Sequence, residues 1–352
     1  MHISTLSLLD QVDDPLFVNG PMEFSMISDV EPKSGGKRFG GFCLLSGLKR
    51  PLFTVVTAVF NGAEHLESTI LSVLGQSHTG LEYIIVDGGS TDETLDILRK
   101  YENSITYWVS EPDKGIYDAF NKACRLVTGR WTIFLGAGDL FYDGSVLASM
   151  AEVVNNVSSE TEIVYGKVRL TKNGKMPVEI LNSQWNQMCG RWGAGRPMLP
   201  HHQGVFHRDR VLSVDTPFDT TYRIAADSKL LYNSIQRAQP VFSDIIVASA
   251  SVGGVSTDVR HSIAAAKEIL RINREFGFIN YPHQFWFYTK AVLKETINGL
   301  GGESVSRLCI DEYRRLTGRK RLREDNEASL FRGARKNREA ATEGRSSKGT
   351  SR

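Results

Sequence analysis

Short apolar runs alternate with amphipathic segments along the first part of the chain. Four of these runs, rich in β-branched and aromatic residues, predict buried strands: FTVVTAVF (53–60), LEYIIVD (81–87), ITYWVS (105–110) and WTIFL (131–135). The segment after the first run has helical spacing, with apolar residues at Leu66, Ile70, Val73 and Leu74. Strands that alternate with helices and are apolar on both faces predict βαβ units and a mainly parallel sheet. The predicted fold class is therefore α/β.

Two further helices carry end signals. The sequence from Ser90 to Glu93 has the form of a capping box, and Leu95 and Leu98 continue a helix from it. Residues 115–129 form a third helical pattern, in which Gly129 is placed as the C-terminal stop.

Small and polar residues follow each predicted strand. They are Asn61 after the first strand, Asp87 to Ser90 after the second, Glu111 to Gly115 after the third and Gly136 to Asp139 after the fourth. The carboxyl ends of parallel strands share one edge of a sheet, and ligands of open α/β folds bind there. This edge is therefore the predicted ligand site.

Each polar residue at this edge has two interpretations. Asp87 can accept hydrogen bonds from a ribose or a base, or it can cap the helix that follows. Lys114 can offset phosphate charge, or it can be a loop lysine in solvent. Asp139 can hold Mg²⁺ or Mn²⁺ together with diphosphate oxygens, or it can cap the helix near Asp143. A dinucleotide-binding motif GxGxxG is absent after the first strand.

Composition narrows the class of protein. The chain has 352 residues, 41% of them hydrophobic and 23% charged, which is typical of a soluble globular protein. It holds no apolar run of membrane-spanning length and no secretory signal. Its four cysteines are scattered without a CxxC pair, so a disulfide framework or a zinc site is not expected. A cytoplasmic location fits best, with peripheral contact at the inner membrane as an extension of it.

The ordered set of motifs resembles the family 2 glycosyltransferases, which are nucleotide-sugar-dependent enzymes of the GT-A fold. The subgroup it is similar to builds bacterial surface polysaccharides and exopolysaccharides. The resemblance covers residues 53 to about 258, and it rests on five segments: TVVTAVFNGAEHLESTILSVLGQSHTGLEYIIVDGGSTDETLDIL, WVSEPDKGIYDAFNKA, GRWTIFLGAGD, HHQGVFHRD and FDTTYRIAADSKLL, followed by GGVST. A mainly parallel, Rossmann-like sheet flanked by helices, with a helical C-terminal extension, is the expected architecture.

The resemblance implies a site for a nucleotide diphosphate sugar. Phe60 lies against the base and Asn61 beside the nucleoside, and Asp87 is the nucleoside-binding acid, although Gly88 replaces a second acid found in some members. The remaining implied residues, on the sugar-diphosphate side and the helix behind it, are Asp113, Lys114, Gly115 and Asn121.

Asp139 is implied to be the remaining acid of the metal-binding DxD-type motif. This chain has Gly136 and Gly138 where the family pattern usually has further acids. Mg²⁺ commonly keeps water and takes ligands from substrate phosphates, so one carboxylate can suffice. We therefore expect binding of Mg²⁺ or Mn²⁺ only together with a nucleoside diphosphate.

The later segments are implied to carry the acceptor chemistry. Inverting transfer needs a carboxylate that removes a proton from the acceptor hydroxyl, and Asp227 takes that role by resemblance, with Asp219 as a rival. From the sequence alone, Asp227 can equally cap the helix that follows it. His201, His202 and Gln203 are interpreted as acceptor-pocket residues, because no third zinc ligand has suitable spacing.

The C-terminal part has two interpretations. Residues 276–297 are strongly aromatic, so they form either a helix packed on the core or an interfacial helix on an anionic bilayer. The sequence from Arg314 to Arg352 holds thirteen Lys and Arg against five Asp and Glu, and a disordered basic tail is expected. The expected division of the chain is a loosely ordered extension over 1–50, a GT-A domain over 51–260, a helical segment over 261–313 and the tail over 314–352.

The predicted activity is metal-dependent transfer of a hexose-type residue, with inversion, from a nucleotide diphosphate sugar to a glycan or lipid-linked acceptor in polysaccharide biosynthesis. No nucleic-acid partner is expected. A sugar-phosphate nucleotidyltransferase is an alternative, but the loop after the first strand, FNGAEH, lacks the Gly-rich basic sequence such enzymes need. A catalytically inactive relative that binds nucleotide sugar is the second alternative.

Overall fold

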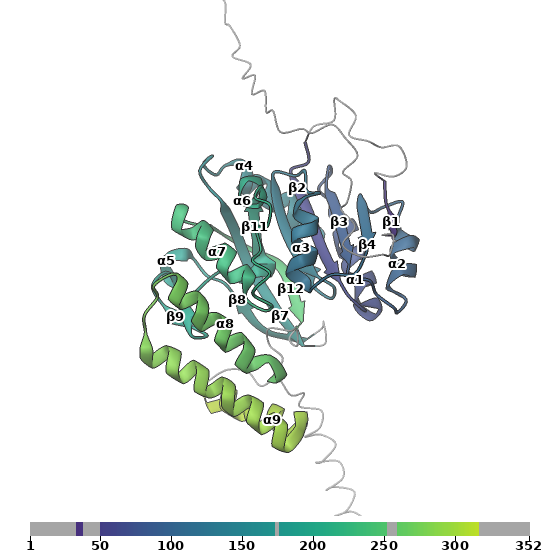
Figure 1. The fold of residues 1–352 in the computed structure, drawn as a ribbon. Helices are drawn as coiled ribbons and strands as arrows, with labels where there is room; N and C mark the ends of the chain where they lie inside the picture. Colours follow the sequence, from purple (N-terminus) through teal and green to yellow (C-terminus); the bar gives the residue numbers. More distant parts are fainter. Residues whose placement is uncertain (1–32, 38–49, 173–175, 252–258, 317–352) are drawn as a thin grey trace, which may run out of the picture. The chain divides into compact units, whose positions relative to one another are not determined.

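The structure is a computed structural model that describes residues 33–37, 50–172, 176–251 and 259–316 (Figure 1). The predicted tail over 314–352 lies outside the described residues apart from 314–316, which belong to the last helix. The predicted extension over 1–50 also lies outside them, apart from 33–37 and Arg50.

Four parallel strands form the part of the sheet that the sequence predicted. β2 (Phe53–Val59) lies between β3 (Glu82–Asp87) and β5 (Trp131–Gly136), and β4 (Tyr107–Ser110) continues the sheet beyond β3. All three pairings are parallel. The register aligns Val59 with Asp87 and Ala58 with Gly136, so the carboxyl ends of these strands lie level at one edge.

The other half of the sheet is mixed. β11 (Val205–Arg208) runs antiparallel between β5 and β7 (Ile163–Lys172), and β12 (Val241–Ser251) runs parallel to β7. Antiparallel strands form the two edges, β1 (Lys33–Gly35) on β4 and β6 (Leu140–Phe141) on β12. A further antiparallel strand, β8 (Met176–Leu181), pairs with β7 outside this order. The predicted α/β class is confirmed, with a parallel centre to which antiparallel strands are added.

Helices cover both faces of the sheet (Figure 1). Residues of α1 (Ala63–Leu74), α2 (Thr94–Tyr101) and α4 (Val146–Asn155) share one apolar cluster with alternate residues of β2 such as Val55. Residues of α3 (Ile116–Cys124), α7 (Ala226–Arg237) and α8 (Ser262–Glu275) share a second cluster with the intervening residues such as Val56. Strands buried on both faces explain the continuous apolar runs in the sequence.

The remaining elements are short, except for the last helix. They are α5 (Trp185–Met188), β9 (Trp192–Gly193), β10 (Arg196–Pro197), α6 (Asp209–Leu212), the 3₁₀ turns His202–Gly204 and Val259–His261, and α9 (Tyr281–Leu316). Gly302, with φ of 71°, interrupts α9. Among the described residues, no helix has both the length and the apolarity needed to cross a bilayer.

Two predicted helix ends were wrong. α2 begins at Thr94 without a capping box, because Ser90 is used by Asp87 and Asn61 instead. α3 ends at Cys124, five residues before Gly129. Gly129 lies against the start of β2, where a Cβ would come within 2.5 Å of Thr54 Oγ1, so its small size serves strand packing rather than a helix stop.

Candidate active site

Asp87 organises the loop that follows β3. It is fully buried, and its Oδ2 accepts hydrogen bonds from Ser110 Oγ at 2.6 Å, Ser90 N at 3.0 Å and Gly89 N at 3.2 Å. Its Oδ1 accepts a short hydrogen bond from Ser90 Oγ. Both oxygens of Asp87 are therefore engaged within the protein, by the loop after β3 and by Ser110 of β4. Asp87 does not cap the helix that follows, because the N-cap position of α2 is Glu93.

The loop after β2 is fastened to this ordered loop. Asn61 adopts a left-handed φ of 47°, its N–H donates to Ser90 Oγ at 2.7 Å, and its Oδ1 accepts the Thr91 N–H at 2.9 Å. Phe60 precedes it with 63% of its surface exposed. A large aromatic side chain is thus held in solvent at the strand edge, where it can stack on a planar ligand.

Asp113 lies beside Gly88, the residue that follows Asp87. A Cβ on Gly88 would come within 2.6 Å of Asp113 Oδ2, so the Asp113 carboxylate fills the space that a side chain at 88 would take. Its Oδ1 accepts the Gly115 N–H at 2.8 Å, and burial raises the pKa of Asp113, with Asp87 adding to that rise. Position 88 carries no second acid, but the carboxylate of Asp113, which follows β4, lies in the space beside it.

Lys114 and Gly115 begin the turn into α3. The Lys114 N–H donates to Asp118 Oδ2 at 3.0 Å, and its side chain is exposed. Gly115 has a φ of 120°, a conformation that side chains disfavour, and space for a Cβ is open there. The turn exposes backbone and a basic side chain on the same edge.

Asn121 is placed differently from the other predicted residues. It is buried, its Nδ2 donates to Phe218 O at 2.7 Å and its Oδ1 accepts the Phe218 N–H at 2.9 Å. Asn121 therefore joins α3 to the segment that leads to Asp227.

Asp139 lies just past β5. Its Oδ2 accepts the Gly136 N–H at 3.1 Å, and Thr69 Oγ1 fixes the same turn by donating to Asp139 O at 3.0 Å. Burial raises the pKa of Asp139 to about 6, against the hydrogen bonds from Gly136 and from the Gln203 side chain. The turn adjoins the Asn61 loop, since a Cβ on Gly62 would lie 3.4 Å from Ala137 Cβ.

Gln203 links Asp139 to His201. His201 Nδ1 lies 2.6 Å from Gln203 Oε1, which leaves the Gln203 amide nitrogen to donate to the Asp139 carboxylate. Burial lowers the pKa of His201, so its ring is neutral at pH 7. The predicted metal ligand and two predicted acceptor residues therefore form one connected group.

His202 faces an aromatic pocket rather than solvent. Its ring lies 5.7 Å from the Phe134 ring and 5.8 Å from the Phe120 ring, and burial lowers its pKa. Neither ring nitrogen has a hydrogen-bond partner among the described residues. Both His201 and His202 lie within electrostatic range of Asp227.

Asp227 lies in the first turn of α7. The Tyr117 hydroxyl is 3.0 Å from Asp227 Oδ1 and 2.7 Å from Ile224 O, so α3 holds both the acid and the loop before it. Burial raises the pKa of Tyr117 well above its usual value, and the negative charge of Asp227 raises it further. Tyr117 therefore stays protonated as a donor to this acid.

Asp219, the rival for the role of base, is engaged elsewhere. Lys229 Nζ lies 2.8 Å from its Oδ2, and its Oδ1 accepts the Thr221 N–H at 2.9 Å. Although burial opposes the shift, these hydrogen bonds lower the pKa of Asp219 to about 2. A carboxylate with so low a pKa is a weak proton acceptor.

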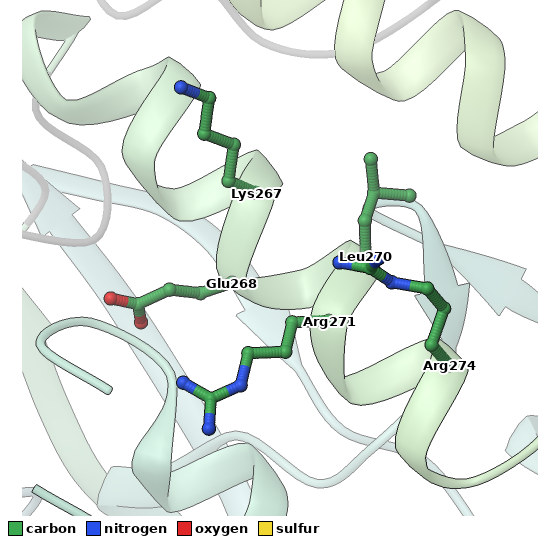
Figure 2. Close-up of a pocket in the computed structure, with 5 residues that line it drawn as sticks. All are labelled: Lys267, Glu268, Leu270, Arg271 and Arg274. Atoms are coloured by element: carbon green, nitrogen blue, oxygen red, sulfur yellow. The ribbon is translucent and has the colours of Figure 1, made fainter. Parts of the chain in front are cut away.

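Glu268 of α8 supports Asp227, and the sequence pattern did not reveal it. Its carboxylate accepts the N–H groups of Arg223 at 2.8 Å, Ile224 at 2.9 Å and Ala225 at 2.9 Å. These groups precede α7, whose N-cap residue makes no side-chain capping bond. Glu268 thus supplies the negative charge that a helix N-terminus favours. It also lines a surface hollow on α8, shown in Figure 2 together with Lys267, Leu270, Arg271 and Arg274.

The side chains around Asp139 offer one carboxylate to a divalent cation. Within the described ranges, no three His, Cys, Asp or Glu side chains are grouped so that they could hold a metal ion. A single carboxylate fits Mg²⁺ or Mn²⁺ when water and the oxygens of a bound diphosphate complete the shell. The residues therefore fit a cation that binds with its nucleotide.

Comparison with known proteins relates this arrangement to one family. The family model described as Glycosyl transferase family 2 matches residues 54–231, half of the chain. A PGL/p-HBAD biosynthesis glycosyltransferase of Mycobacterium bovis is 31% identical over 183 residues, covering 50% of this chain and 67% of that protein. An uncharacterized glycosyltransferase of Mycobacterium tuberculosis is 28% identical over 213 residues, covering 59% and 78%.

Solved structures show a more distant likeness. The mannosyltransferase PcManGT from Pyrobaculum calidifontis, in complex with GDP-Man and Mn²⁺, has a TM-score of 0.49 and 18% identity, covering 74% of this chain and 79% of that chain. TarS 1–349 of S. aureus in complex with UDP has a TM-score of 0.46 and 18% identity, covering 68% and 70%.

Proposed function

This chain belongs to glycosyl transferase family 2, and from that premise we propose that it transfers a sugar, with inversion, from a nucleotide diphosphate sugar to a hydroxyl of a glycan or lipid-linked acceptor. Membership of the family disfavours the nucleotidyltransferase alternative. The polysaccharide pathway expected from the sequence is part of this proposal.

One observation carries the proposal above the others: the environment of Asp227. The acid is held by the Tyr117 hydroxyl at 3.0 Å, and its negative charge acts on His201 and His202. The rival Asp219 is neutralised by Lys229. Asp227 is therefore the carboxylate in this region best placed to accept a proton.

The proposed step follows from that placement. The Asp227 carboxylate accepts the proton of the acceptor hydroxyl as its oxygen attacks the anomeric carbon of the donor. The bond from that carbon to the diphosphate oxygen breaks, and the electron pair leaves with the nucleoside diphosphate. Because attack is from the face opposite the leaving group, the configuration at the anomeric carbon inverts.

The donor side is proposed to hold the nucleotide through three features of the strand edge. Phe60 offers an exposed ring to the base. Asp113 lies where a ribose hydroxyl could donate to it, and Lys114 supplies positive charge for the diphosphate. Asp87 is proposed to act through the loop that it orders, because its own oxygens are occupied.

Metal dependence is also part of the proposal. Asp139 would hold a divalent cation, Mg²⁺ or Mn²⁺, which when bound would offset negative charge on the leaving diphosphate. Since the pKa of Asp139 is about 6, its carboxylate is the ionised form at pH 7. Gln203 keeps that carboxylate oriented by its hydrogen bond.

A screen of UDP-, GDP- and dTDP-sugars with Mg²⁺ or Mn²⁺ tests the proposal, with release of nucleoside diphosphate as the readout. We expect turnover with at least one donor. Asp227→Asn should lower transfer by about 10²–10⁴-fold while donor binding measured by calorimetry stays within twofold to threefold, since the loss of a general base acts on the chemical step. Asp219→Asn is the matched control and should retain most of the rate.

The same screen separates the inactive-relative alternative. The single carboxylate at Asp139, flanked by Gly136 and Gly138, is the feature that favours a pure binder. Donor binding without turnover for any donor would support that alternative. Wild-type rates in Asp227→Asn would instead remove the proposed base.

A further inference from the structure

The outward face of α9 is strongly apolar for a helix on a protein surface. Phe285, Trp286, Leu293 and Leu300 have 65%, 60%, 57% and 87% of their surfaces exposed. Tyr281 and Val292 extend this face, because residues three, four and seven positions apart lie on one side of a helix. We call these six residues the α9 face. Soluble proteins usually scatter exposed apolar side chains, and a contiguous group marks an interaction surface.

A different side of α9 packs on the protein. Ala291 is buried, and the Phe287 ring lies directly against Gly195, where it leaves no room for a Cβ. Glu295 Oε2 accepts the Ile263 N–H at 3.0 Å, which joins α9 to the start of α8 beside it (Figure 1). The α9 face is therefore not needed to hold the helix in place.

Basic residues border this face and follow it in the sequence. Lys290 and Lys294 are exposed one helical turn apart on its flank. The sequence from Arg314 to Arg352 adds thirteen Lys and Arg against five Asp and Glu. Trp, Phe and Tyr next to Lys and Arg are typical of helices that lie in the interface of an anionic bilayer.

We propose that the α9 face binds an anionic lipid surface, with the helix lying in the plane of the interface and its aromatic side chains among the headgroups. Apolar burial and attraction to negative headgroups both favour this occupant. The proposal does not depend on the donor or on the chemical step.

The helix that packs beside α9, α8, supports the acceptor side of the site. Glu268 of α8 holds the loop before Asp227. Asn273 Nδ2 donates to Gly195 O at 2.8 Å, in the turn before Arg196, whose charge acts on His201. Binding through α9 would thus bring a lipid-linked acceptor close to the elements that carry the proposed base.

Vesicle flotation of the full chain tests the proposal. We expect the protein to float with vesicles of phosphatidylcholine and phosphatidylglycerol, and at least about fivefold less with phosphatidylcholine alone, since each basic residue near an anionic surface contributes a factor of that order. Replacing Phe285, Trp286 and Leu293 together by Ser should lower partitioning by at least about a hundredfold.

Control variants show whether a loss of binding is specific to the α9 face. Leu71→Ser removes an equally exposed aliphatic side chain on α1 and should float like the wild type, and Trp286→Leu, which stays apolar, should retain most of the binding. Trp286→Ser alone should give an intermediate loss if the triple variant folds poorly. A wild-type protein that binds neither vesicle, or a triple variant that floats like the wild type, would overturn the proposal. A wild-type dimer that the triple variant loses, without vesicle binding, would assign the face to a second copy and overturn it too.

Discussion

The donor edge and the acceptor side of this site are built in opposite ways. At the donor edge, the Asp87 carboxylate accepts hydrogen bonds from Gly89, Ser90 and Ser110, all within 23 residues of it. On the acceptor side, Asp227 depends on Tyr117, which is 110 residues away in sequence, and on Glu268 from α8. The acid at the donor edge is held by residues close to it in sequence, whereas the acid on the acceptor side is held by residues distant in sequence.

Within the donor edge, Asp87 and Asp139 differ in how their charge is stabilised. Asp87 has a donor for each oxygen, so its charge is compensated inside the protein. Asp139 is half-buried with the Gly136 N–H and the Gln203 side chain as partners, and its pKa rises to about 6. We infer that the hydrogen bonding of Asp87 is complete before a ligand binds, whereas the charge of Asp139 would be fully compensated only by a bound cation.

The largest expected change in stability tests the donor edge. In Asp87→Asn an amide nitrogen replaces one oxygen. Either it faces the Gly89 and Ser90 N–H groups, which can only donate, or the Ser90 hydroxyl must turn to accept from it and loses its own acceptor. Each buried group left unpaired costs about 1–3 kcal/mol, and we expect the free energy of unfolding to fall by about 2–4 kcal/mol. Urea unfolding measures the change, and donor affinity should weaken as the loop loosens.

Asp96→Asn is the control for that measurement. Asp96 is an exposed acid on α2 that pairs with Arg99 at 3.0 Å, and exposed pairs contribute about 0–1 kcal/mol. Equal effects of the two substitutions would contradict the view that Asp87 holds the donor edge together.

The same contrast explains what could be predicted from the sequence. Strand runs buried on both faces have a strong local pattern, so β2 to β5 and their parallel pairing were predicted, and the residues after each strand were placed on one edge. The antiparallel strand β11 between β5 and β7 was not predicted, because the pairing of distant strands is not encoded in the period of either one.

At the site, what the sequence could not predict also depends on contacts between distant parts of the chain. Asn121 was predicted on the helix behind the sugar-diphosphate site. The sequence could not show that its side-chain amide would hydrogen-bond the backbone of Phe218, because side-chain partners are set by the tertiary fold. Glu268 lies outside the motifs, and in the sequence it cannot be distinguished from an ordinary acid on a helix surface. Only the packing of α8 against the loop before α7 gives it a role, so no local signal could have found it.

The second prediction concerns Asp139, whose substitution should raise the free energy of unfolding at pH 7. The pKa of Asp139 in the folded protein is about 6, above its ordinary value of 3.8, so the folded state favours the protonated acid. Its contribution to stability is present below about pH 4 and is lost as pH rises through about 6. Asp139→Asn should therefore stabilise the fold at pH 7 by about 1–2 kcal/mol, less than the full shift implies because the residue is partly exposed, and by little at pH 4.

Thermal unfolding at several pH values without divalent cation measures this effect. The same variant should lose most transfer activity and any stabilisation by Mn²⁺ with a nucleoside diphosphate. Gln203→Glu gives a comparison in the reverse direction, because a second acid beside Asp139 should raise its pKa further. Destabilisation by Asp139→Asn at pH 7 would show that its charge is already compensated, and would remove the contrast with Asp87.

The smallest expected effect tests how the C-terminal helices act on the site. Glu268→Gln keeps the size of the side chain but removes the negative charge that meets the N–H groups of Arg223, Ile224 and Ala225, so the loop before Asp227 should be less well held. We expect kcat to fall by about threefold to tenfold with donor affinity unchanged, because hydrogen bonds to a charged group are worth about 1.5–3 kcal/mol and part of that remains with the amide. Lys267→Gln, one residue away and exposed on the same helix, should leave kcat unchanged. A matching fall in donor affinity, or an equal effect of Lys267→Gln, would mean that Glu268 supports the fold in general and not the position of Asp227.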